Sequence, residues 1–559
     1  MADNLTPVKR KLLRIEEMRQ ERSSWLPRYR EISTYLLPFS GRFFPQDRNR
    51  GEKSFNSIYD STATRAARIL AAGLMAGVTS PARPWFRLAT QDPDLNKATA
   101  VKQWLADVAQ LMRDIFAKSN TYRSLHTQYE ELGAFGTAPA ILDDNFSTVI
   151  WSTPLTAGEY MIGTDDLGKV NRLSREYEMT VGQMVSKFGR EACSPTVQNL
   201  YDNHRLNTWV TVAHVVEPRE VAERRVGSPL SRDMAWSSCH IETGANHDRF
   251  LRESGYPDFP VLAPRWNIRG ADIYGHGPAF EALCDIKGLQ QQSLRKSQAI
   301  DYQTKPPLQM PTALKGQGKG TLPGGVVYFD QVGSGNQIKT LFDVPLSLND
   351  LRLDIAEVQH RIDRAFYVDL FLMLADVDTR QPVTATEIAE RKEEKLLMLG
   401  PVLERLHDEL LSPLIDSTFL KMVRAGILPP PPPEMHGMEL TVQFISVLAQ
   451  AQRAVGLGSM DRLLGTVASM AQFRPEVLDK VDTDEVVDRY SDMLGVDPAI
   501  IVADDKVALI RTQRAKQQAA MQAAAMVQRG ADTAAKLGSI DTSKPNAASD
   551  LMAGLQGYN

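Results

Sequence analysis

The sequence predicts a mainly α-helical protein of several domains that contains one α+β region. The chain has 559 residues, more than one ordinary core accommodates, so about two to four domains are expected. Apolar residues recur at helical spacing through most of the chain. Between residues 138 and 265 the pattern changes to short alternating runs separated by Gly and Asp, which is typical of antiparallel strands.

The N-terminal part is predicted to be helical. Residues 8–37 give two helices, and two more are expected at about 97–118 and 121–133. Between these pairs, Ser61 is the predicted cap of a helix with a small-residue face, on which another backbone could approach closely. That face is formed by Ala66, Leu70, Gly73 and Gly77.

In the α+β region, the run Thr208 to Val215 alternates as a strand does, and so does the segment Met234 to Glu242. A short helix near 181–189 is expected to begin with a capping box formed by Thr180 and Gln183.

Two long helices are expected to flank a small β insertion. Pro278 to Thr304 predicts a polar helix, roughly 40 Å long, with little apolar stripe. Residues 308–348 are rich in Gly and Val, with strands near 326–329 and 338–341. A second helix begins near Leu348, and its apolar face contains Leu351, Ile355, Val358, Ile362 and Phe366.

The C-terminal part is again predicted to be helical. After a polar loop, a capping box at Thr384–Glu387 opens a very long helix that reaches about Arg424 and is kinked at Pro401. Five prolines from Pro429 to Pro433 form a stiff spacer. Residues 440–527 are expected to be helical, and the last 30 or so residues to be a flexible tail.

Charge and cysteine content exclude several classes of protein. The chain has 64 basic and 68 acidic side chains and a net charge of −4, which argues against a high-affinity DNA clamp but not against a passage through which DNA slides. Its three dispersed cysteines favour neither a disulfide framework nor a zinc site. No secretory signal and no apolar run long enough to span a bilayer is visible.

Motifs for catalysis are missing from the sequence. It contains no P-loop, HExxH or G-x-S-x-G motif. The glycines at 316, 318 and 320 lack the spacing of a nucleotide-binding loop, and Cys239-His240 with His247 matches no standard metal site. We therefore expect neither an enzyme nor a bound cofactor or metal.

Two segments resemble a known family. Ala72 to Phe86 (AGLMAGVTSPARPWF) is similar to the N-terminal signature of the head-to-tail connector, or portal, proteins of podoviruses. Pro264-Arg265-Trp266, followed by Tyr274-Gly275 and Asp285-Ile286-Lys287, resembles the segment that leads into the family's stem helix. The resemblance covers roughly residues 8–530.

The resemblance implies the portal fold, assembled as a ring of twelve subunits at one capsid vertex. In that fold an α+β wing, a stem, a clip and a helical crown or barrel follow one another along the chain. The expected divisions are the wing (1–265), the first stem helix (266–304), the clip (305–348), the second stem helix (349–372), the channel or tunnel loop (373–385), a long kinked helix that returns to the wing (386–446), the crown and barrel (447–530) and the flexible tail (531–559).

The resemblance also implies partners. Double-stranded DNA would pass through the channel without sequence specificity during packaging and ejection. The terminase large subunit would dock at the clip, and tail adaptor or nozzle proteins would replace it. Major capsid, scaffolding and internal core proteins are further expected partners, and a membrane is not. The protein would be made in the host bacterial cytoplasm and reside in the virion.

Candidate channel residues are acidic. Cyclic symmetry repeats each side chain around a ring, so acids on the second long helix and the following loop would make a lining that repels DNA weakly. The alternative is a solvated face or intersubunit salt bridges. The candidates are Asp354, Glu357, Asp363, Asp376 and Asp378, with Arg380 as one transient phosphate contact.

Candidate docking residues are basic. Lys287, Arg295 and Lys296 on the first long helix would face the capsid shell or an acidic neighbour, unless they form a solvated helix face. Lys315 and Lys319 in the glycine-rich insertion would meet DNA or the terminase, unless that loop is a plain flexible turn.

Two other functions compete with this interpretation. Another ring protein of the virion, such as a tail adaptor, is disfavoured by the length of the chain. A packaging-motor enzyme is disfavoured because the sequence has no P-loop.

Overall fold

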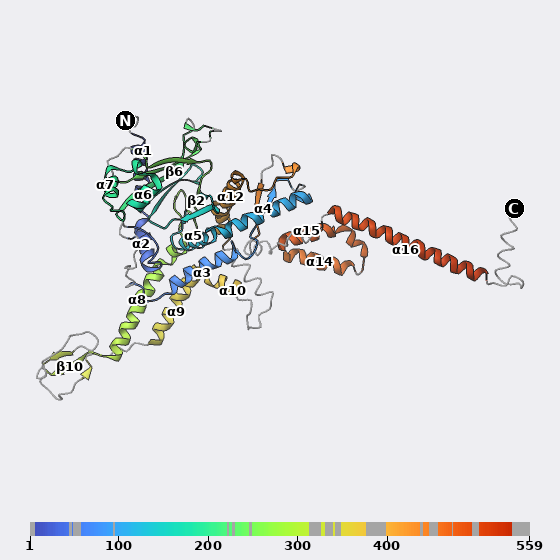
Figure 1. The fold of residues 1–559 in the computed structure, drawn as a ribbon. Coiled ribbons are helices and arrows are strands. Elements are labelled where there is room, and N and C mark those ends of the chain that lie inside the picture. Colours follow the sequence, from blue (N-terminus) through green and yellow to red (C-terminus); the bar gives the residue numbers. More distant parts are fainter. Residues whose placement is uncertain are drawn as a thin grey trace. The chain divides into compact units, whose positions relative to one another are not determined.

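Helices and small sheets alternate along the chain (Figure 1). The computed structural model describes residues 6–43, 47, 57–92, 95–220, 223–225, 228, 230–244, 249–311, 326–329, 339–340, 348–375, 399–435, 440–445, 457–471, 473–494, 502 and 504–538. The chain divides into two units. The first comprises Met1–Ala89, Leu105–Pro430 and Leu440–Val481, and the second comprises Thr90–Trp104, Pro431–Glu439 and Asp482–Asn559.

The expected N-terminal helices are present. They are α1 (Pro7–Arg22), α2 (Leu26–Tyr35), α3 (Thr62–Gly77), α4 (Thr99–Lys118) and α5 (Thr121–Phe135). Ser61 occupies the predicted N-cap position of α3, but its side chain makes no capping hydrogen bond. Instead the Thr62 N–H donates to Asp60 Oδ1 at 2.8 Å.

The small-residue face of α3 receives a side chain at Gly73. A Cβ on Gly73 would lie 2.2 Å from the ring of Phe371, so only glycine leaves room for that ring. The expected close approach of another backbone is therefore wrong at this position. Such an approach occurs at Gly136 after α5, where φ is +71° and a Cβ would lie 2.4 Å from the Gly275 carbonyl oxygen.

A five-stranded antiparallel sheet forms the centre of the α+β region. Its strands, in spatial order, are β4 (Tyr160–Thr164), β5 (Val170–Thr180), β6 (Trp209–Pro218), β7 (Trp236–Glu242) and β8 (Arg252–Tyr256). The alternating runs predicted from the sequence are thus strands. Val8 and Ile15 of α1 pack on one face, against Met161, Ala213, Val215 and Ile241.

Two short helices pack on the opposite face of this sheet. They are α6 (Val181–Phe188), which begins with the predicted capping box, and α7 (Pro195–Asp202). Their buried Val181, Met184 and Val197 contact Val212 and Leu251. Short 3₁₀ turns occur at η3 (Leu95–Lys97), η4 (Arg190–Ala192) and η6 (Ser231–Asp233).

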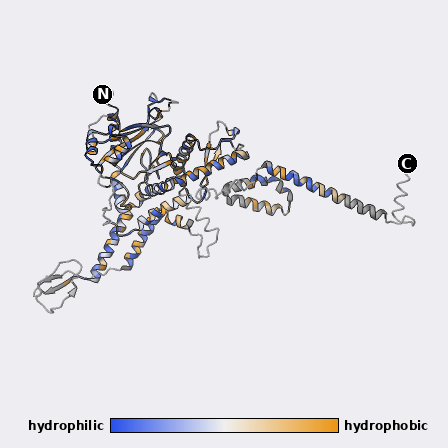
Figure 2. Cartoon of the chain, viewed as in Figure 1, coloured by the Kyte–Doolittle hydropathy of each residue, from blue (hydrophilic) through white to orange (hydrophobic). Residues whose placement is uncertain are grey.

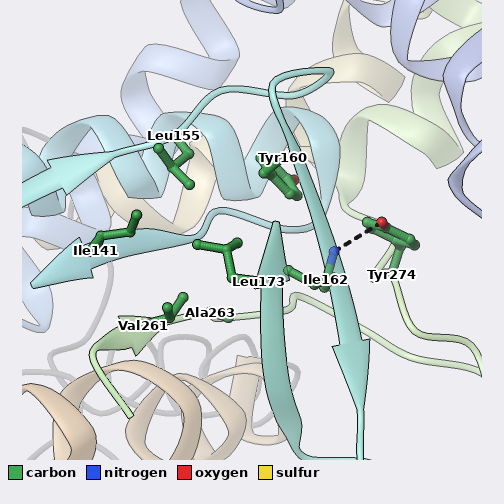
Figure 3. Packing of buried hydrophobic residues seen from close by; sticks show 8 residues of the cluster. All are labelled: Ile141, Leu155, Tyr160, Ile162, Leu173, Val261, Ala263 and Tyr274. Carbon is green, nitrogen blue, oxygen red and sulfur yellow. Dashed lines mark hydrogen bonds between the residues drawn. The ribbon is translucent and has the colours of Figure 1, made fainter. Parts of the chain in front are cut away.

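A three-stranded sheet, with the order β3-β2-β9, shares a core with β4 and β5. Its strands are β2 (Ala140–Asn145), β3 (Val149–Pro154) and β9 (Val261–Leu262). Figure 3 shows this cluster, in which the Ile162 N–H donates to the buried Tyr274 hydroxyl at 3.2 Å. This bond ties Tyr274, which precedes the first long helix, to the sheet.

The two long helices lie side by side (Figure 1). The first, α8 (Pro278–Thr304), has the predicted bounds, between Gly277 and a Pro-Pro pair. The single helix expected over 349–372 is wrong. It is two helices, α9 (Leu348–Ala365) and α10 (Val368–Ala375), because Tyr367 adopts a left-handed backbone with φ of +55°.

The insertion between these helices contains a small sheet. β10 (Leu308–Pro311) pairs in parallel with β11 (Val326–Phe329) and antiparallel with β12 (Lys339–Thr340). The two strands predicted near 326–329 and 338–341 are therefore present, and β10 adds a third.

The returning helix is irregular at a different place from the one expected. Residues 399–406 are α-helical through Pro401, and a π-helical turn follows at His407–Leu411 before α12 (Ser412–Ala425). Pro413 lacks the N–H that would bond to the Glu409 carbonyl, and the wider turn accommodates this loss. The chain then forms a 3₁₀ turn, η9 (Pro433–Met435), and β13 (Leu440–Phe444). β13 pairs with β1 (Phe86–Thr90).

The helix expected from residue 440 is wrong at its start, where β13 is a strand, and most of the described residues that follow are helical as predicted. α14 (Leu457–Ala471) and η10 (Pro475–Lys480) belong to the first unit. In the second unit, Arg511 of α16 (Asp504–Gly538) forms two bonds, of 2.6 and 2.7 Å, with Asp484 of α15 (Thr483–Leu494). The tail expected from residue 531 is wrong over 531–538, where alanines and Leu537 favour helix. Within the described segments, no helix is long and apolar enough to cross a membrane.

Candidate functional site: the α8–α9 pair and its attachment

Polar contacts hold α8 and α9 in antiparallel register. Gln292 Nε2 donates to Asp354 Oδ2 at 2.6 Å, and Arg361 lies 3.2 Å from Asp285. From Asp285 to Gln292 is seven residues forward along α8, and from Arg361 to Asp354 is seven residues backward along α9. The two contacts therefore belong to one antiparallel register. Seven residues are two helical turns, about 10 Å of helix. The pair is therefore fixed at two levels.

Apolar packing supports the same arrangement. The predicted face of α9 is buried at Ile355, Val358, Ile362 and Phe366. The expectation that α8 has little apolar stripe is wrong for its first half, which buries Ala279, Ala282, Leu283, Ile286 and Leu289. Beyond Gln290 only Ala299 of α8 is buried, and hydrophilic residues dominate this half of the helix (Figure 2).

Each of the three acidic candidates on α9 has a partner within the chain. Asp354 accepts the bond from Gln292, and Glu357 lies 3.2 Å from Arg361 on the same helix. Asp363 accepts two bonds from Arg65 of α3, at 2.9 and 3.1 Å. Burial raises the pKa of Asp363, and Arg65 opposes that rise. Of the two acids that form ion pairs, Glu357 is the more exposed: 70% of its side chain is accessible to solvent, against 18% for Asp363.

Hydrogen bonds of Gln290 and Gln359 fasten both helices to the loop before α3. Gln290 is 3% exposed, and its Oε1 accepts from the N–H groups of Tyr59 and Asp60 at 2.6 and 2.9 Å. Its Nε2 donates to the Asp60 carbonyl oxygen at 2.9 Å. From α9, Gln359 Nε2 donates to Asp60 Oδ2 at 2.8 Å. The backbone of Asp60 thus bonds to α8, and its carboxylate bonds to both α3 and α9.

The three basic candidates on α8 differ in their surroundings. Lys287 lies 3.2 Å from Glu31 of α2, and its ammonium is 5.9 Å from the centre of the Tyr35 ring. The acidic neighbour expected for Lys287 is therefore in its own chain. Arg295 is exposed and Lys296 is partly buried, and neither forms an ion pair with any residue that the structure describes.

A buried ion pair anchors the segment that leads into α8. Arg265 is 3% exposed, and its guanidinium contacts both oxygens of Glu409 in the π-helical turn, the shortest bond being 2.6 Å. The Arg265 N–H also donates to Glu409 at 2.8 Å. Its Nη2 donates to the Gly168 carbonyl oxygen at 2.8 Å. The Arg265 guanidinium is paired with a carboxylate through more than one bond and has a further hydrogen bond to the backbone. A buried charge is tolerated in this geometry.

Five of the candidates lie outside the described residues. They are Asp376, Asp378, Arg380, Lys315 and Lys319. The channel loop predicted over 373–385 is described only up to Ala375. Within the segments that the structure does describe, no group of three or more His, Cys, Asp or Glu side chains is placed to hold a metal ion.

The sequence did not indicate the residues that fasten the helices. Asp60 and Gln290 are polar residues in a loop and in a polar helix, and no local pattern joins positions 230 residues apart. Arg265 lay in a motif that pointed to the family, but its partner Glu409 did not. A pair of that kind is detectable only from covariation or a structure.

The chain matches a protein family over most of its length. Residues 9–501 match the family described as "Bacteriophage head to tail connecting protein". A relative from Bordetella phage BPP-1, called "Probable portal protein", is 56% identical over 553 residues, which are 99% of each chain. The "Portal protein" of Salmonella phage epsilon15 is 43% identical over 545 residues, 97% of each chain.

A solved structure is also similar, at a lower level. A chain from the "Virion of native gene transfer agent (GTA) particle" is 10% identical, with a TM-score of 0.31, over 72% of this chain and 85% of that one. The sequence relatives, which match nearly the whole length of the chain, show the family. This chain belongs to the head-to-tail connecting proteins of bacteriophages, the portal protein family.

Proposed function

We propose that the protein forms a ring of twelve subunits at one capsid vertex and conducts double-stranded DNA during packaging and ejection. Its membership of the portal family is the observation that carries the proposal. Closed cyclic symmetry gives such a ring an axial hole. In this proposal α8 and α9 are the stem helices, the insertion between them is the clip, and residues 1–265 form most of the wing.

The α8–α9 pair supports the role of a stem. Two cross-helix contacts fix its register, and Asp60 and Arg65 bind it to α3. A helical pair held at both its flank and its base resists bending when load is applied along the channel. The terminase large subunit and then tail adaptor proteins dock at the clip, while major capsid, scaffolding and internal core proteins contact other surfaces of the virion-borne ring. The protein is made in the host cytoplasm.

The acids of α9 and of the following loop are proposed to line the channel. A basic lining would bind DNA phosphates and slow the passage of DNA, whereas an acidic one repels them weakly. Asp354 and Glu357 are exposed on α9, and the half-buried Asp363 is occupied by Arg65. We therefore assign the lining to Asp354 and Glu357, with Asp376 and Asp378 beyond them. Arg380 supplies one transient contact with a phosphate.

Imaging and mass of the purified protein test the assembly. Twelve copies of 62.2 kDa give roughly 750 kDa, and particle images should show a closed ring with a central hole. The ring would be refuted by a protein that stays monomeric at high concentration and that also forms no ring in capsids assembled with it.

Packaging and ejection test the lining. Glu357→Lys should slow both processes, because each ring gains a band of positive charge next to the DNA. Glu191→Lys makes the same change at an exposed residue of η4 and should leave both rates unchanged. Equal rates for the Glu357→Lys ring and the unchanged ring would exclude Glu357 from the lining.

A further inference from the structure

A row of basic side chains crosses the five-stranded sheet. Arg175 of β5 lies opposite His214 of β6, His214 lies opposite His240 of β7, and His240 lies opposite Arg252 of β8. Directly opposed residues in an antiparallel sheet project from the same face. Four neighbouring strands therefore place Arg175, His214, His240 and Arg252 in one line.

Most of this row is buried, and polar atoms in it have no partner. Arg175, His214 and His240 are 9%, 2% and 7% exposed. The two imidazoles stack with ring centres 4.1 Å apart and planes inclined by 10°. His214 Nε2 is 2.9 Å from Ser238 Oγ. The Nδ1 atoms of both histidines and Nε of Arg175 are buried without a hydrogen bond, and a buried polar atom without a partner is costly.

Further positive charge lies at the rim of the row. Arg252 and Lys187 of α6 are exposed. The Lys187 ammonium is 5.5 Å from the centre of the Phe188 ring, which is itself 5.2 Å from the His240 ring. None of Arg175, Lys187 and Arg252 forms an ion pair with a residue in the described segments. Three cations thus gather at one place, without the carboxylate partners that structural ion pairs provide.

The acids nearby leave an excess of positive charge. Asp143 of β2 accepts a hydrogen bond from the Tyr256 hydroxyl at 2.8 Å. Burial and then the charge of Arg175 lower the pKa of Lys187, and the charge of Asp143 opposes that fall. Glu159 faces Arg42 at 4.0 Å, and burial raises its pKa. These two acids act on a set of four cations that includes Arg42. Among these six charged groups, the cations exceed the acids by two.

The histidines are neutral near pH 7. Burial, followed by His240 and then by Arg175, lowers the pKa of His214 well below its ordinary value. Burial and then the Lys187 charge lower the pKa of His240 to about 3. A neutral imidazole presents one N–H as a donor. Recognition by charge would therefore come from the arginines and Lys187, and the imidazoles would contribute directional hydrogen bonds.

We propose that this row, together with Lys187, is a binding site for a single phosphate-type oxyanion. A tetrahedral dianion offers oxygens enough for a guanidinium, an ammonium and imidazole N–H groups at once, and it matches the unneutralised charge. The buried position of Arg175 limits the ligand to a small or terminal phosphate. The phosphates of a DNA duplex would reach only Arg252 and Lys187 at the rim.

Titration of the full-length protein with inorganic phosphate tests the site. Calorimetry at constant ionic strength, with chloride as the balancing anion, should show saturable binding of one phosphate per chain. A nucleoside triphosphate in a second arm distinguishes a terminal phosphate from the free ion, and either one binding through this row supports the proposal. A short DNA duplex forms the third arm.

Two variants and one control assign the binding to this row. Arg252→Ala removes an exposed cation and should weaken phosphate about tenfold or more, which is the usual effect of losing one charged hydrogen bond. Arg175→Gln should abolish binding, with circular dichroism as the check on folding. Arg172→Ala removes an exposed cation three residues away on β5 and should change nothing.

Three results would overturn the proposal. One is a phosphate titration indistinguishable from chloride, and another is phosphate binding that survives the Arg252→Ala and Arg175→Gln changes. The third is Arg252-dependent binding of the duplex without any binding of free or terminal phosphate, which would make the row a nucleic-acid surface instead.

Discussion

A buried glutamate should make the stability of this protein depend on pH. Glu131 on α5 is 4% exposed. It accepts hydrogen bonds from Thr156 Oγ1 at 2.8 Å and from the Ala157 N–H at 3.3 Å. Burial raises the pKa of Glu131 from 4.5 to about 7, and the two hydrogen bonds oppose that rise without cancelling it. The folded protein therefore holds this proton more tightly than the unfolded chain does.

The change Glu131→Gln removes the titration and mimics the protonated acid, because its amide oxygen can accept from the Ala157 N–H while its NH2 group donates to Thr156 Oγ1. Because the folded pKa is raised, the stabilising effect of the proton is complete below about pH 4.5 and is lost as the pH rises towards 7. A difference of about 2.5 pH units, at about 1.4 kcal/mol each, corresponds to about 3 kcal/mol. The variant should match the unchanged protein near pH 4.5 and exceed it by about 3 kcal/mol at pH 8.

Urea unfolding followed by tryptophan fluorescence at pH 4.5, 6, 7 and 8 measures this difference. At each pH, the unfolding free energy of the variant is compared with that of the unchanged protein. Other groups titrate in both proteins, so their contributions cancel in this difference. Glu130→Gln, at the neighbouring half-buried position, controls for the loss of one carboxylate from α5. A difference between Glu131→Gln and the unchanged protein that is the same at all four pH values would refute the reasoning.

Three further changes test the contacts that position the long helices. Gln290→Leu takes the acceptor away from the N–H groups of Tyr59 and Asp60, in the loop before α3, and should lower stability by about 1–3 kcal/mol in urea unfolding; an unchanged midpoint would contradict this. Arg265→Met leaves the Glu409 carboxylate with only Arg405, at 3.4 Å, as a charged partner and should cost up to about 3 kcal/mol, part of which a second change, Glu409→Gln, should restore. Gly73→Val puts a side chain where Phe371 lies and should speed hydrogen exchange in α10; exchange rates like those of the unchanged protein would count against the packing described.

Local patterns were enough to predict most of the helices and several of the strands. The ends of α8 follow from Pro278 in its first turn and from the Pro-Pro pair after it. The capping box of α6 is likewise a local signal, formed by residues three apart. The break at Tyr367 has no such signal, because an aromatic residue is rarely found with positive φ. Tertiary packing around that residue overrides its local preference.

The candidate site was less predictable, because its geometry depends on long-range partners. The sequence identified the acids of α9 from their position relative to the apolar stripe, and it could not show which of them are paired. Asp363 and Arg65 are 298 residues apart in the chain. Spacing within one helix gives only pairs such as Glu357 and Arg361, four residues apart. Which acids of α9 form ion pairs is therefore a property of the fold.

The partners of these acids determine how much negative charge the α8–α9 pair keeps. Arg361 is shared, since it lies 3.2 Å from Asp285 and 3.2 Å from Glu357. Asp354 accepts its bond from Gln292, an uncharged amide, and so retains its full charge. This cross-helix set thus contains three carboxylates and one guanidinium, a net charge of about −2 per subunit at pH 7. Exposed ion pairs of this kind contribute little to stability, about 0–1 kcal/mol each. If each subunit of a ring turned this set towards the channel, the lining would be acidic even with every pair intact, because register alone leaves the carboxylates in excess.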